Sequence, residues 1–320
     1  MLYENASDVI LDDIFLGLTG FIPGVELALK LEGLNPAGSI KLKTAVALVE
    51  AAENSGALAP GGHVIESSSG NLGIALSSVC ASRGYAFTCV VDPNTSQQSK
   101  ALMRALGAEV VVVGERDECG GFLQSRIDYI AARLREHPSL VWPNQYANQA
   151  NPQAHHDTTA PSIIKQFPTV DHLFVGAGTT GTLMGVVRYF RQYSPHTRIV
   201  AVDTEGSITF GFPPGPRRIP GLGTSRRPEI FRPGQADETV LVPEADAIRM
   251  CRRLAAERGL LLGGSTGAVL SGVQRLRADI PSGSRVVAIS PDNGDRYLQT
   301  VYSDAWVLDH YSPAALETAG

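Results

Sequence analysis

Apolar residues in the first half of the chain recur at two spacings, one that suits strands and one that suits helices. Residues 63–67 and 86–92 are short apolar runs, which predict buried strands. Between them, apolar positions recur at helical spacing over residues 71–83, and Gly84 ends the predicted helix. This alternation of strand and helix predicts an α/β fold, with a mostly parallel sheet and helices on its faces.

The same alternation continues along the chain in two successive series. Residues 207–233 break it, because they are rich in Gly, Pro and Arg and have no clear period, so we expect a functional loop there. Further strands are expected at residues 25–31, 108–114, 140–145, 172–176, 198–203 and 285–290. Further helices are expected from residue 42 to near residue 56, and at residues 96–106, 121–136, 182–191, 245–258 and 266–276.

Composition limits the class of protein. A length of 320 residues suits two lobes of ordinary domain size, and 43% hydrophobic and 18% charged residues are typical of a soluble globular protein. A formal net charge of -5 gives no indication of a nucleic-acid partner. No apolar run approaches the ~20 residues of a membrane span, and residues 1–13 lack the pattern of a secretory signal.

Metal sites are not expected. The four cysteines, at positions 80, 89, 119 and 251, form no C-x-x-C pair, and a reduced, cytoplasmic setting fits them best. His155 and His156 are adjacent, so on a helix their side chains would point apart. A surface or packing role is therefore expected for this pair.

The first candidate for chemistry is the motif N-P-A-G-S-I-K at residues 35–41. A turn-forming run leads straight into a predicted helix, so Lys41 lies near a helix start, where a positive charge is unfavourable. That position favours the neutral, nucleophilic amine that forms a Schiff base with an aldehyde. The alternative is a solvated surface lysine beside Lys43.

Four further motifs lie at the ends of predicted strands, most of them just before a helix. The runs S-S-S-G-N-L-G at 67–73 and G-A-G-T-T-G-T at 176–182 combine hydroxyls with helix-start N–H groups, which can hold a phosphate or carboxylate. The runs G-G-S-T-G at 263–267 and P-D-N-G-D-R-Y at 291–297 could alone be a helix cap and a turn. Strand carboxyl ends are where ligands bind in open α/β sheets.

Residues 176–181 also match G-x-G-x-x-G, and Asp203 follows at the end of the next predicted strand. An NAD-dependent oxidoreductase is therefore an alternative. That interpretation leaves Lys41 and the 67–73 cluster without roles.

The ordered set of motifs resembles the cysteine synthases and cystathionine β-synthases, which are fold-type II pyridoxal-phosphate enzymes, over roughly residues 29–306. The resemblance implies two three-layer α/β/α domains of the tryptophan synthase β type. A small N-terminal domain would span residues 38–148, and a large cofactor-binding domain would comprise residues 1–37 and 149–320. It also implies pyridoxal 5'-phosphate as cofactor and a homodimer.

One branch of that family is more similar still, through residues 120–126, 144–148, 220–226 and 297–304. This branch, the N-(2-amino-2-carboxyethyl)-L-glutamate synthases, joins O-phospho-L-serine to L-glutamate in siderophore or antibiotic pathways that lead to 2,3-diaminopropionate. The resemblance implies this β-replacement reaction. A cysteine synthase that uses O-phosphoserine or O-acetylserine with sulfide is the nearest alternative.

The resemblance also implies roles for individual residues. Lys41 would carry the Schiff base and move the proton, Asn71 would contact the ring oxygen of the cofactor, and Ser265 would contact its pyridine nitrogen. The phosphate would be held by Gly178, Thr179, Thr180, Gly181 and Thr182. The substrate carboxylate would be received by Ser68, Ser69, Leu72 and Gln145, and the substrate side chain would face Arg126 and Tyr146.

Two features qualify these roles. The family usually continues Lys-Asp-Arg, whereas Lys41 is followed by Leu42 and Lys43, so Lys43 is a rival for the Schiff base. A hydroxyl such as that of Ser265 cannot hold the pyridine nitrogen protonated as an aspartate would. The ring is then expected to be a weaker electron sink, which favours loss of the β-substituent over transamination. Arg126 would favour a phosphate leaving group, because guanidinium binds phosphate in two-point contact.

Overall fold

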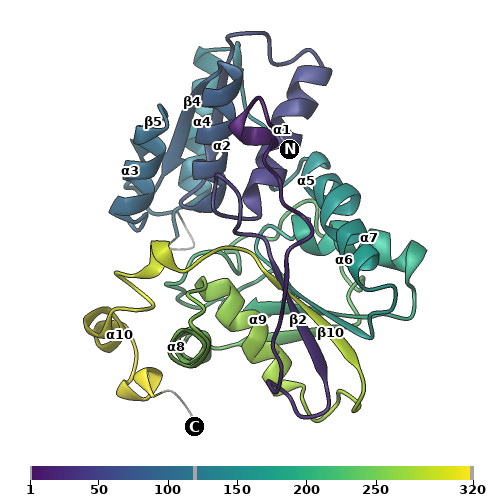
Figure 1. Ribbon diagram of the computed structural model, residues 1–320. Coiled ribbons are helices and arrows are strands. Elements are labelled where there is room, and N and C mark those ends of the chain that lie inside the picture. The colour runs from purple at the N-terminus through teal and green to yellow at the C-terminus, as the bar shows by residue number, and fades with distance from the viewer. Residues whose placement is uncertain (1, 118–120, 318–320) are drawn as a thin grey trace.

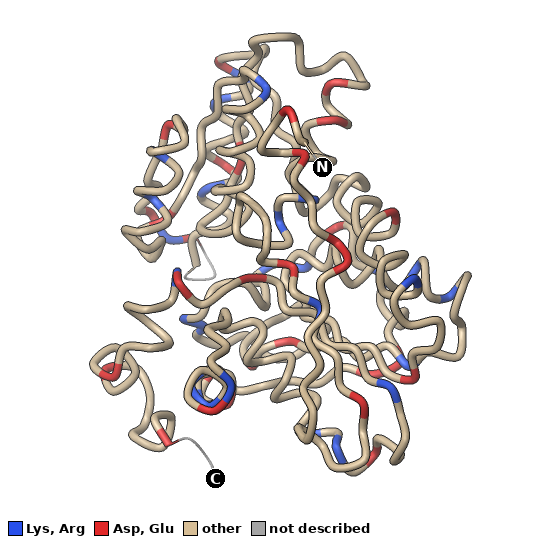
Figure 2. The backbone as a smooth tube through the Cα atoms, in the orientation of Figure 1, with Lys and Arg blue, Asp and Glu red and all other residues tan. Residues whose placement is uncertain are grey.

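The computed structural model describes residues 2–117 and 121–317, which form two β-sheets flanked by helices (Figure 1). Strand order is β5-β4-β3-β6 in the four-stranded sheet and β1-β2-β10-β7-β8-β9 in the six-stranded sheet. Basic and acidic residues are interspersed over both bodies (Figure 2). In the described part of the chain, no helix is both long and apolar enough to span a lipid bilayer.

The four-stranded sheet is wholly parallel and carries helices on both faces. Val64 and Cys89 pack into the cluster that α1 and α2 build, whereas the next residues along, Ile65 and Val90, pack with Ile130 of α4. This two-residue alternation makes a three-layer body. Its strands are β3 (His63–Ser67), β4 (Ala86–Val91), β5 (Glu109–Val112) and β6 (Leu140–Val141), and its helices are α1 (Lys41–Asn54), α2 (Asn71–Arg83), α3 (Gln97–Ala105) and α4 (Leu123–Glu136).

The six-stranded sheet is parallel except for β1, which pairs antiparallel with β2 at one edge. Phe174 faces the cluster built with α8 and α9, and its neighbours Leu173 and Val175 face the one built with α6 and α7. The strands are β1 (Phe15–Gly17), β2 (Glu26–Leu31), β7 (His172–Gly176), β8 (Arg198–Thr204), β9 (Glu238–Val242) and β10 (Arg285–Ser290). The helices are α6 (Ala160–Gln166), α7 (Gly181–Tyr193), α8 (Glu244–Arg258) and α9 (Gly264–Arg275).

Smaller elements connect these two bodies and cover the end of the chain. A short helix, α5 (Ala150–Ala154), runs through one π-helical turn (His155–Thr159) directly into α6. Near the C-terminus, α10 (Asp304–His310) and a 3-10 turn (Pro313–Leu316) pack on α8 through Val307 and Ala315. Further 3-10 turns span Ala6–Asp8 and Asp295–Tyr297.

The predicted α/β class is confirmed, and the expected strands and helices lie within a few residues of their predicted bounds. One expected strand, at residues 140–145, is wrong beyond Val141: the chain turns away there because Trp142 and Gln145 bond to the Glu66 carboxylate. The short strands β1 and β9, and the helices α5, α6 and α10, were not predicted. Cys119 and Gly120 lie outside the described residues.

The two sheets present their strand carboxyl ends to a common region. Asn71, which starts the helix after β3, donates its Nδ2 to Asp292 Oδ2 in the loop after β10, at 2.7 Å. This bond spans the boundary between the proposed small domain (38–148) and large domain (1–37, 149–320). Each sheet draws its strands from one side of that division, which supports the division as a proposal.

Candidate active site

Lys41 is the first residue of α1 and lies where the two bodies meet. The preceding amide, Ile40 N, donates to Pro291 O at 2.7 Å, which holds the helix start against the loop after β10. Burial lowers the pKa of the Lys41 amine to about 8, and no charged group contributes to this shift. A half-buried lysine without a counter-ion therefore provides more of the neutral, nucleophilic amine than a solvated lysine does.

The rival lysine, Lys43, is in a different environment. Its Nζ lies 2.7 Å from Glu32 Oε2, donates to Thr159 Oγ1 at 3.1 Å and pairs with Asp12. Lys30 shares the Glu32 carboxylate at 3.1 Å. Two carboxylates and a hydroxyl therefore occupy the Lys43 amine with ion pairs and a hydrogen bond. The contrast supports Lys41 as the reactive amine.

The loop between β7 and α7 forms the best phosphate cradle in the described residues. Thr180 is held in the left-handed region at φ 68° directly before α7, and its buried Oγ1 has no hydrogen-bond partner. A Cβ on Gly178 would come within 2.6 Å of Gly221 O, and one on Gly181 within 2.0 Å of Asn151 Oδ1. Only glycine therefore fits at these two positions. The orphaned hydroxyl and the free N–H groups of a helix start suit a phosphate.

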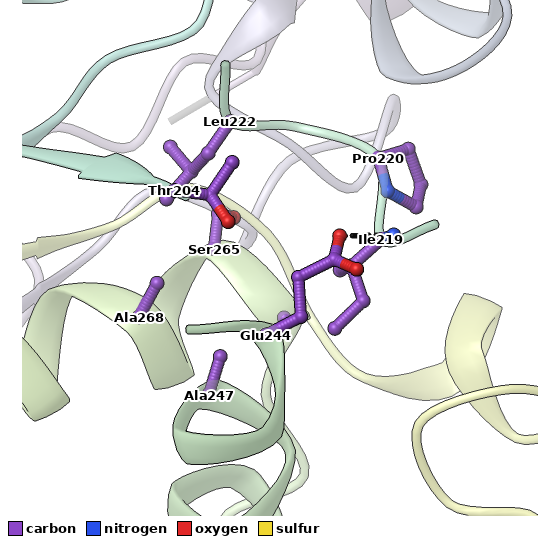
Figure 3. Close-up of a pocket in the computed structure, with 9 residues that line it drawn as sticks. Thr204, Ile219, Pro220, Leu222, Glu244, Ala247, Ser265 and Ala268 are labelled. Carbon is purple, nitrogen blue, oxygen red and sulfur yellow. Dashed lines mark hydrogen bonds between the residues drawn. The ribbon is translucent and has the colours of Figure 1, made fainter. Parts of the chain in front are cut away.

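Ser265 and Asn71 converge on one buried carboxylate, that of Asp292. Ser265 lies 3.4 Å from Asp292 Oδ1, at the start of α9, and the Asp292 side chain is also held by Tyr297 OH at 2.5 Å. A cavity of about 10 Å³ lies beside Ser265 and is lined mostly by apolar side chains such as Leu222 (Figure 3). It holds about one water molecule at most and so is a packing gap, not a cofactor site.

The expected carboxylate-binding residues surround the start of α2. Ser68 Oγ accepts from Gly73 N at 2.9 Å, and Gln145 Nε2 donates to Ser67 O at 3.0 Å. The Ser67 hydroxyl is buried without a partner. Ser69 is half-buried, and Leu72 is buried within the small-domain core. The structure therefore brings Ser68 and Gln145 together around the end of β3.

Arg126 of α4 is buried, 7% exposed, next to the buried Asp92. Its Nη1 lies 3.5 Å from Asp92 Oδ2, which is an ion pair but too long for a strong hydrogen bond. Arg126 Nε and Nη1 have no hydrogen-bond partner. Burial raises the pKa of the nearby Tyr146, and the charge of Arg126 opposes that rise. A buried guanidinium with unpaired N–H groups is suited to an anionic ligand.

Several residues of this region were not predicted. Asn151 is fully buried and connects three segments: its Nδ2 donates to Gln145 O at 2.8 Å and Thr179 Oγ1 at 3.2 Å, and its Oδ1 accepts from Thr44. Glu66 accepts hydrogen bonds from Trp142 and Gln145, and burial raises its pKa to about 7. The sequence signal that could have identified Glu66 is a single acidic residue within an otherwise apolar predicted strand.

Comparison with known proteins gives a consistent result. Residues 19–292 match the family model described as pyridoxal-phosphate dependent enzyme. N-(2-amino-2-carboxyethyl)-L-glutamate synthases from Ralstonia nicotianae and Cupriavidus metallidurans are 43% and 42% identical, each over 88% of this chain and 84% of the relative.

Solved structures are similar over nearly the whole chain. The structure of an O-ureido-L-serine synthase has a TM-score of 0.88 at 33% identity and covers 96% of this chain and 100% of its own. An O-acetylserine dependent cystathionine β-synthase from Helicobacter pylori has a TM-score of 0.87 at 29% identity, with 95% and 100% coverage. The predicted family and fold type are thus confirmed.

The two lysines can be separated experimentally. We expect Lys41→Met to abolish covalent capture of an aldehyde by the apo-protein, measured by mass after borohydride reduction. In the unaltered protein, the capture rate should rise as pH increases through about 8 and then level off, because only the neutral amine reacts.

Lys43→Met is the matched variant. We expect it to retain capture but to lower the free energy of unfolding by about 3 kcal/mol, because a buried charge pair is broken while Lys30 still partners Glu32. Capture at residue 43, or its loss in Lys43→Met protein that is still folded, would contradict the assignment.

Proposed function

The chain belongs to the family of pyridoxal-phosphate dependent enzymes, and from this premise we propose that it joins O-phospho-L-serine to L-glutamate. The products are N-(2-amino-2-carboxyethyl)-L-glutamate and phosphate. The names of the relatives at 43% and 42% identity support this reaction. The structural observation that carries it is the buried Arg126 guanidinium, whose Nε and Nη1 have no hydrogen-bond partner. We further propose a cytoplasmic homodimer that serves a 2,3-diaminopropionate pathway for a siderophore or antibiotic.

The residues present suit the cofactor. Thr179, Thr180, Thr182 and the α7 start would hold its phosphate, Asn71 and Ser265 would contact its ring, and Lys41 would bind it covalently. When bound, pyridoxal phosphate supplies an aldehyde for that attachment and a conjugated ring that takes up negative charge from the substrate Cα atom.

Different side chains of the protein would assist different steps of the β-replacement. Ser68 and Gln145 would orient the substrate carboxylate at the end of β3, which fixes the Cα–H bond relative to Lys41. The Lys41 amine would remove and later return the proton at Cα, a role that fits its lowered pKa. Arg126 would bind the phosphate that leaves from Cβ. The amine of glutamate would attack the same carbon.

A phosphate leaving group explains the state of Arg126 better than a neutral ester does. Asp92 compensates the charge of Arg126 without forming a hydrogen bond to its Nε or Nη1. A phosphate offers several acceptor oxygens to such a planar fork, whereas an acetyl ester carries no anion to pair with it. Tyr146 lies near enough for the Arg126 charge to lower the pKa of its hydroxyl against the larger effect of burial.

The loop at residues 207–233 offers an anion-binding residue for the second substrate. Arg226 pairs with Glu229, Arg227 bonds to Thr209 O, and Arg218 is exposed. Arg217 Nη1 donates to Leu222 O at 3.4 Å, but its buried Nε has no hydrogen-bond partner, and its charge lowers the pKa of Tyr146. We propose that Arg217 binds a carboxylate of glutamate.

Two alternatives remain as outcomes of the test. Structural relatives with other substrates share this fold, so the fold alone does not identify the second substrate. If sulfide is used in place of glutamate, the protein is a cysteine synthase. An NAD-dependent oxidoreductase built on residues 176–181 is disfavoured by the family match.

The first experiment identifies the product. Purified holoenzyme is incubated with O-phosphoserine and equal concentrations of glutamate, aspartate, glutamine or sulfide, and products are identified by mass spectrometry. We expect the glutamate adduct and stoichiometric phosphate. Preferential formation of cysteine would replace the proposal with the sulfhydrylase.

Arg126→Ala tests leaving-group recognition. We expect kcat/KM for O-phosphoserine to fall about 10- to 100-fold, the worth of a charge-assisted hydrogen bond. Activity with O-acetylserine, measured on the same preparation, should fall much less, and this comparison controls for any loss of folded protein. An equal loss with both donors would contradict the proposed binding of the phosphate leaving group by Arg126.

Arg217→Leu tests recognition of the second substrate. We expect KM for glutamate to rise about tenfold or more, because a carboxylate partner is lost. Release of phosphate from O-phosphoserine without glutamate should be unchanged. Arg218→Leu, an adjacent exposed arginine, is the control and should match the unaltered protein. An unchanged KM in Arg217→Leu would contradict this role.

A further inference from the structure

Glu66 is a buried carboxylate that the proposed reaction does not use. It lies near the end of β3, is 0% exposed and accepts hydrogen bonds from N–H groups. Oε1 accepts Ser67 N at 2.8 Å and Trp142 Nε1 at 2.9 Å, and Oε2 accepts Gln145 N at 3.1 Å. These partners can only donate, so none of them could receive a proton from a protonated Glu66. The arrangement therefore fits the ionised carboxylate.

Two of these bonds hold the chain where it leaves β6. Trp142 and Gln145 bound the segment at residues 142–145, which leads from the four-stranded sheet toward α5. Within this segment, Asn144 has a left-handed backbone at φ 53°. Because a side-chain carboxylate anchors this segment in place of a neighbouring strand, the position of Gln145 depends on Glu66.

The other contacts of Gln145 fix its orientation. Its Nε2 donates to Ser67 O at 3.0 Å, and its backbone carbonyl accepts Asn151 Nδ2 at 2.8 Å. A primary amide has two N–H donors, so one Nε2 hydrogen is left for a ligand. Since backbone and side chain are both held, that hydrogen has a defined direction at the end of β3.

We propose that Glu66 is a positioning residue for the carboxylate of the amino-acid substrate. Its two oxygens hold Trp142 and Gln145, so that the free N–H of Gln145 is directed at the carboxylate that Ser68 also receives. This inference rests on the proposed carboxylate contact of Gln145, and not on which leaving group or second substrate is used.

The charge of Glu66 acts in the opposite direction, so position and charge must be separated. A buried carboxylate repels the carboxylate of a ligand, and a neutral amide at residue 66 would remove that repulsion. Glutamine has only one acceptor oxygen, however. Glu66→Gln therefore sets an N–H group either against Gln145 N or against Ser67 N and Trp142 Nε1. A buried donor left without an acceptor is costly, so the segment is released.

The Arg126 cation reduces the importance of the repulsion. Burial raises the pKa of Tyr146, and within that shift the Arg126 charge lowers the pKa while the Glu66 charge raises it. The cation and the anion thus act on the same region and partly cancel. We accordingly expect loss of position, and not relief of repulsion, to decide the effect of Glu66→Gln.

The test compares two ligands that differ only at the carboxylate, L-serine and L-serinamide. Holoenzyme is titrated with each ligand, and binding is followed by the visible absorption of the cofactor. The pH is fixed well above the pKa of Glu66, which burial raises to about 7, so that the carboxylate is charged. For Glu66→Gln we expect the affinity for L-serine to fall about tenfold, and the affinity for L-serinamide to stay unchanged.

Glu109→Gln is the matched control. It makes the same change in the same sheet, at the exposed start of β5, where Glu109 accepts Thr88 Oγ1 at 2.8 Å. Both affinities should equal those of the unaltered protein. Because the two ligands are compared on one preparation, a loss of folded protein would weaken both equally and would not imitate the expected result.

Two further variants make the test independent of the folding of one mutant. Trp142→Phe removes one donor to Oε1 and keeps the carboxylate, so we expect about a two- to threefold loss of affinity for L-serine alone. If Glu66→Gln does not fold, an unchanged L-serine affinity in Trp142→Phe overturns the proposal. Gln145→Ala should itself lower the L-serine affinity, and Glu66→Gln should add little in that background, because the coupling runs through the Gln145 amide.

The outcomes separate the levels of the argument. A tighter L-serine complex in Glu66→Gln, or an equal weakening of both ligands, would overturn the positioning role. If Gln145→Ala lowers the L-serine affinity but Glu66→Gln does not, the role of Glu66 alone is overturned. If neither variant lowers it, the carboxylate contact of Gln145 is overturned as well. None of these results depends on whether phosphoserine and glutamate are the substrates, which the product assay decides.

Discussion

An amine without a counter-ion, held at the start of α1, is the constraint around which this site is organised. Lys41 is half-buried and no carboxylate of the described residues pairs with its amine, whereas Lys43, two residues on, is surrounded by Asp12, Glu32 and Thr159. Residues two positions apart on a helix point to nearly opposite sides, so these two lysines meet different surroundings. The fold keeps acidic groups on the Lys43 side, and this separation leaves the Lys41 amine free to react.

A buried polar network connects that charge cluster to the phosphate cradle. Lys43 donates to Thr159, whose hydroxyl bonds to His155 Nδ1 at 3.0 Å. His155 Nε2 lies 3.1 Å from Thr44 Oγ1 and 3.2 Å from Thr182 Oγ1. Burial and the nearby lysines depress the pKa of His155, so its ring is neutral. The π-helical turn thus presents His155 inward, as a hydrogen-bonded link, while His156 bonds to Asp157 at the surface.

The sequence allowed most of the architecture to be predicted, because glycine and serine punctuation at strand ends is a local signal. The helix Asn71–Arg83 and the strands His63–Ser67 and His172–Gly176 have the predicted bounds. The chain beyond β6 was mistaken for strand because its backbone direction depends on Glu66, a partner 79 residues from Gln145. Asp292 could be read only as a turn residue for the same reason, since its partners Asn71 and Ser265 are distant in sequence.

The Ser265 contact bears on the choice of leaving group. A hydroxyl cannot hold a ring nitrogen protonated as an aspartate would, so the proposed Ser265 contact would leave the ring a weaker electron sink. Expulsion of a good leaving group such as phosphate would then be favoured over return of the Cα proton. Binding of that phosphate by Arg126, as proposed above, would act on the same choice between elimination and return of the proton.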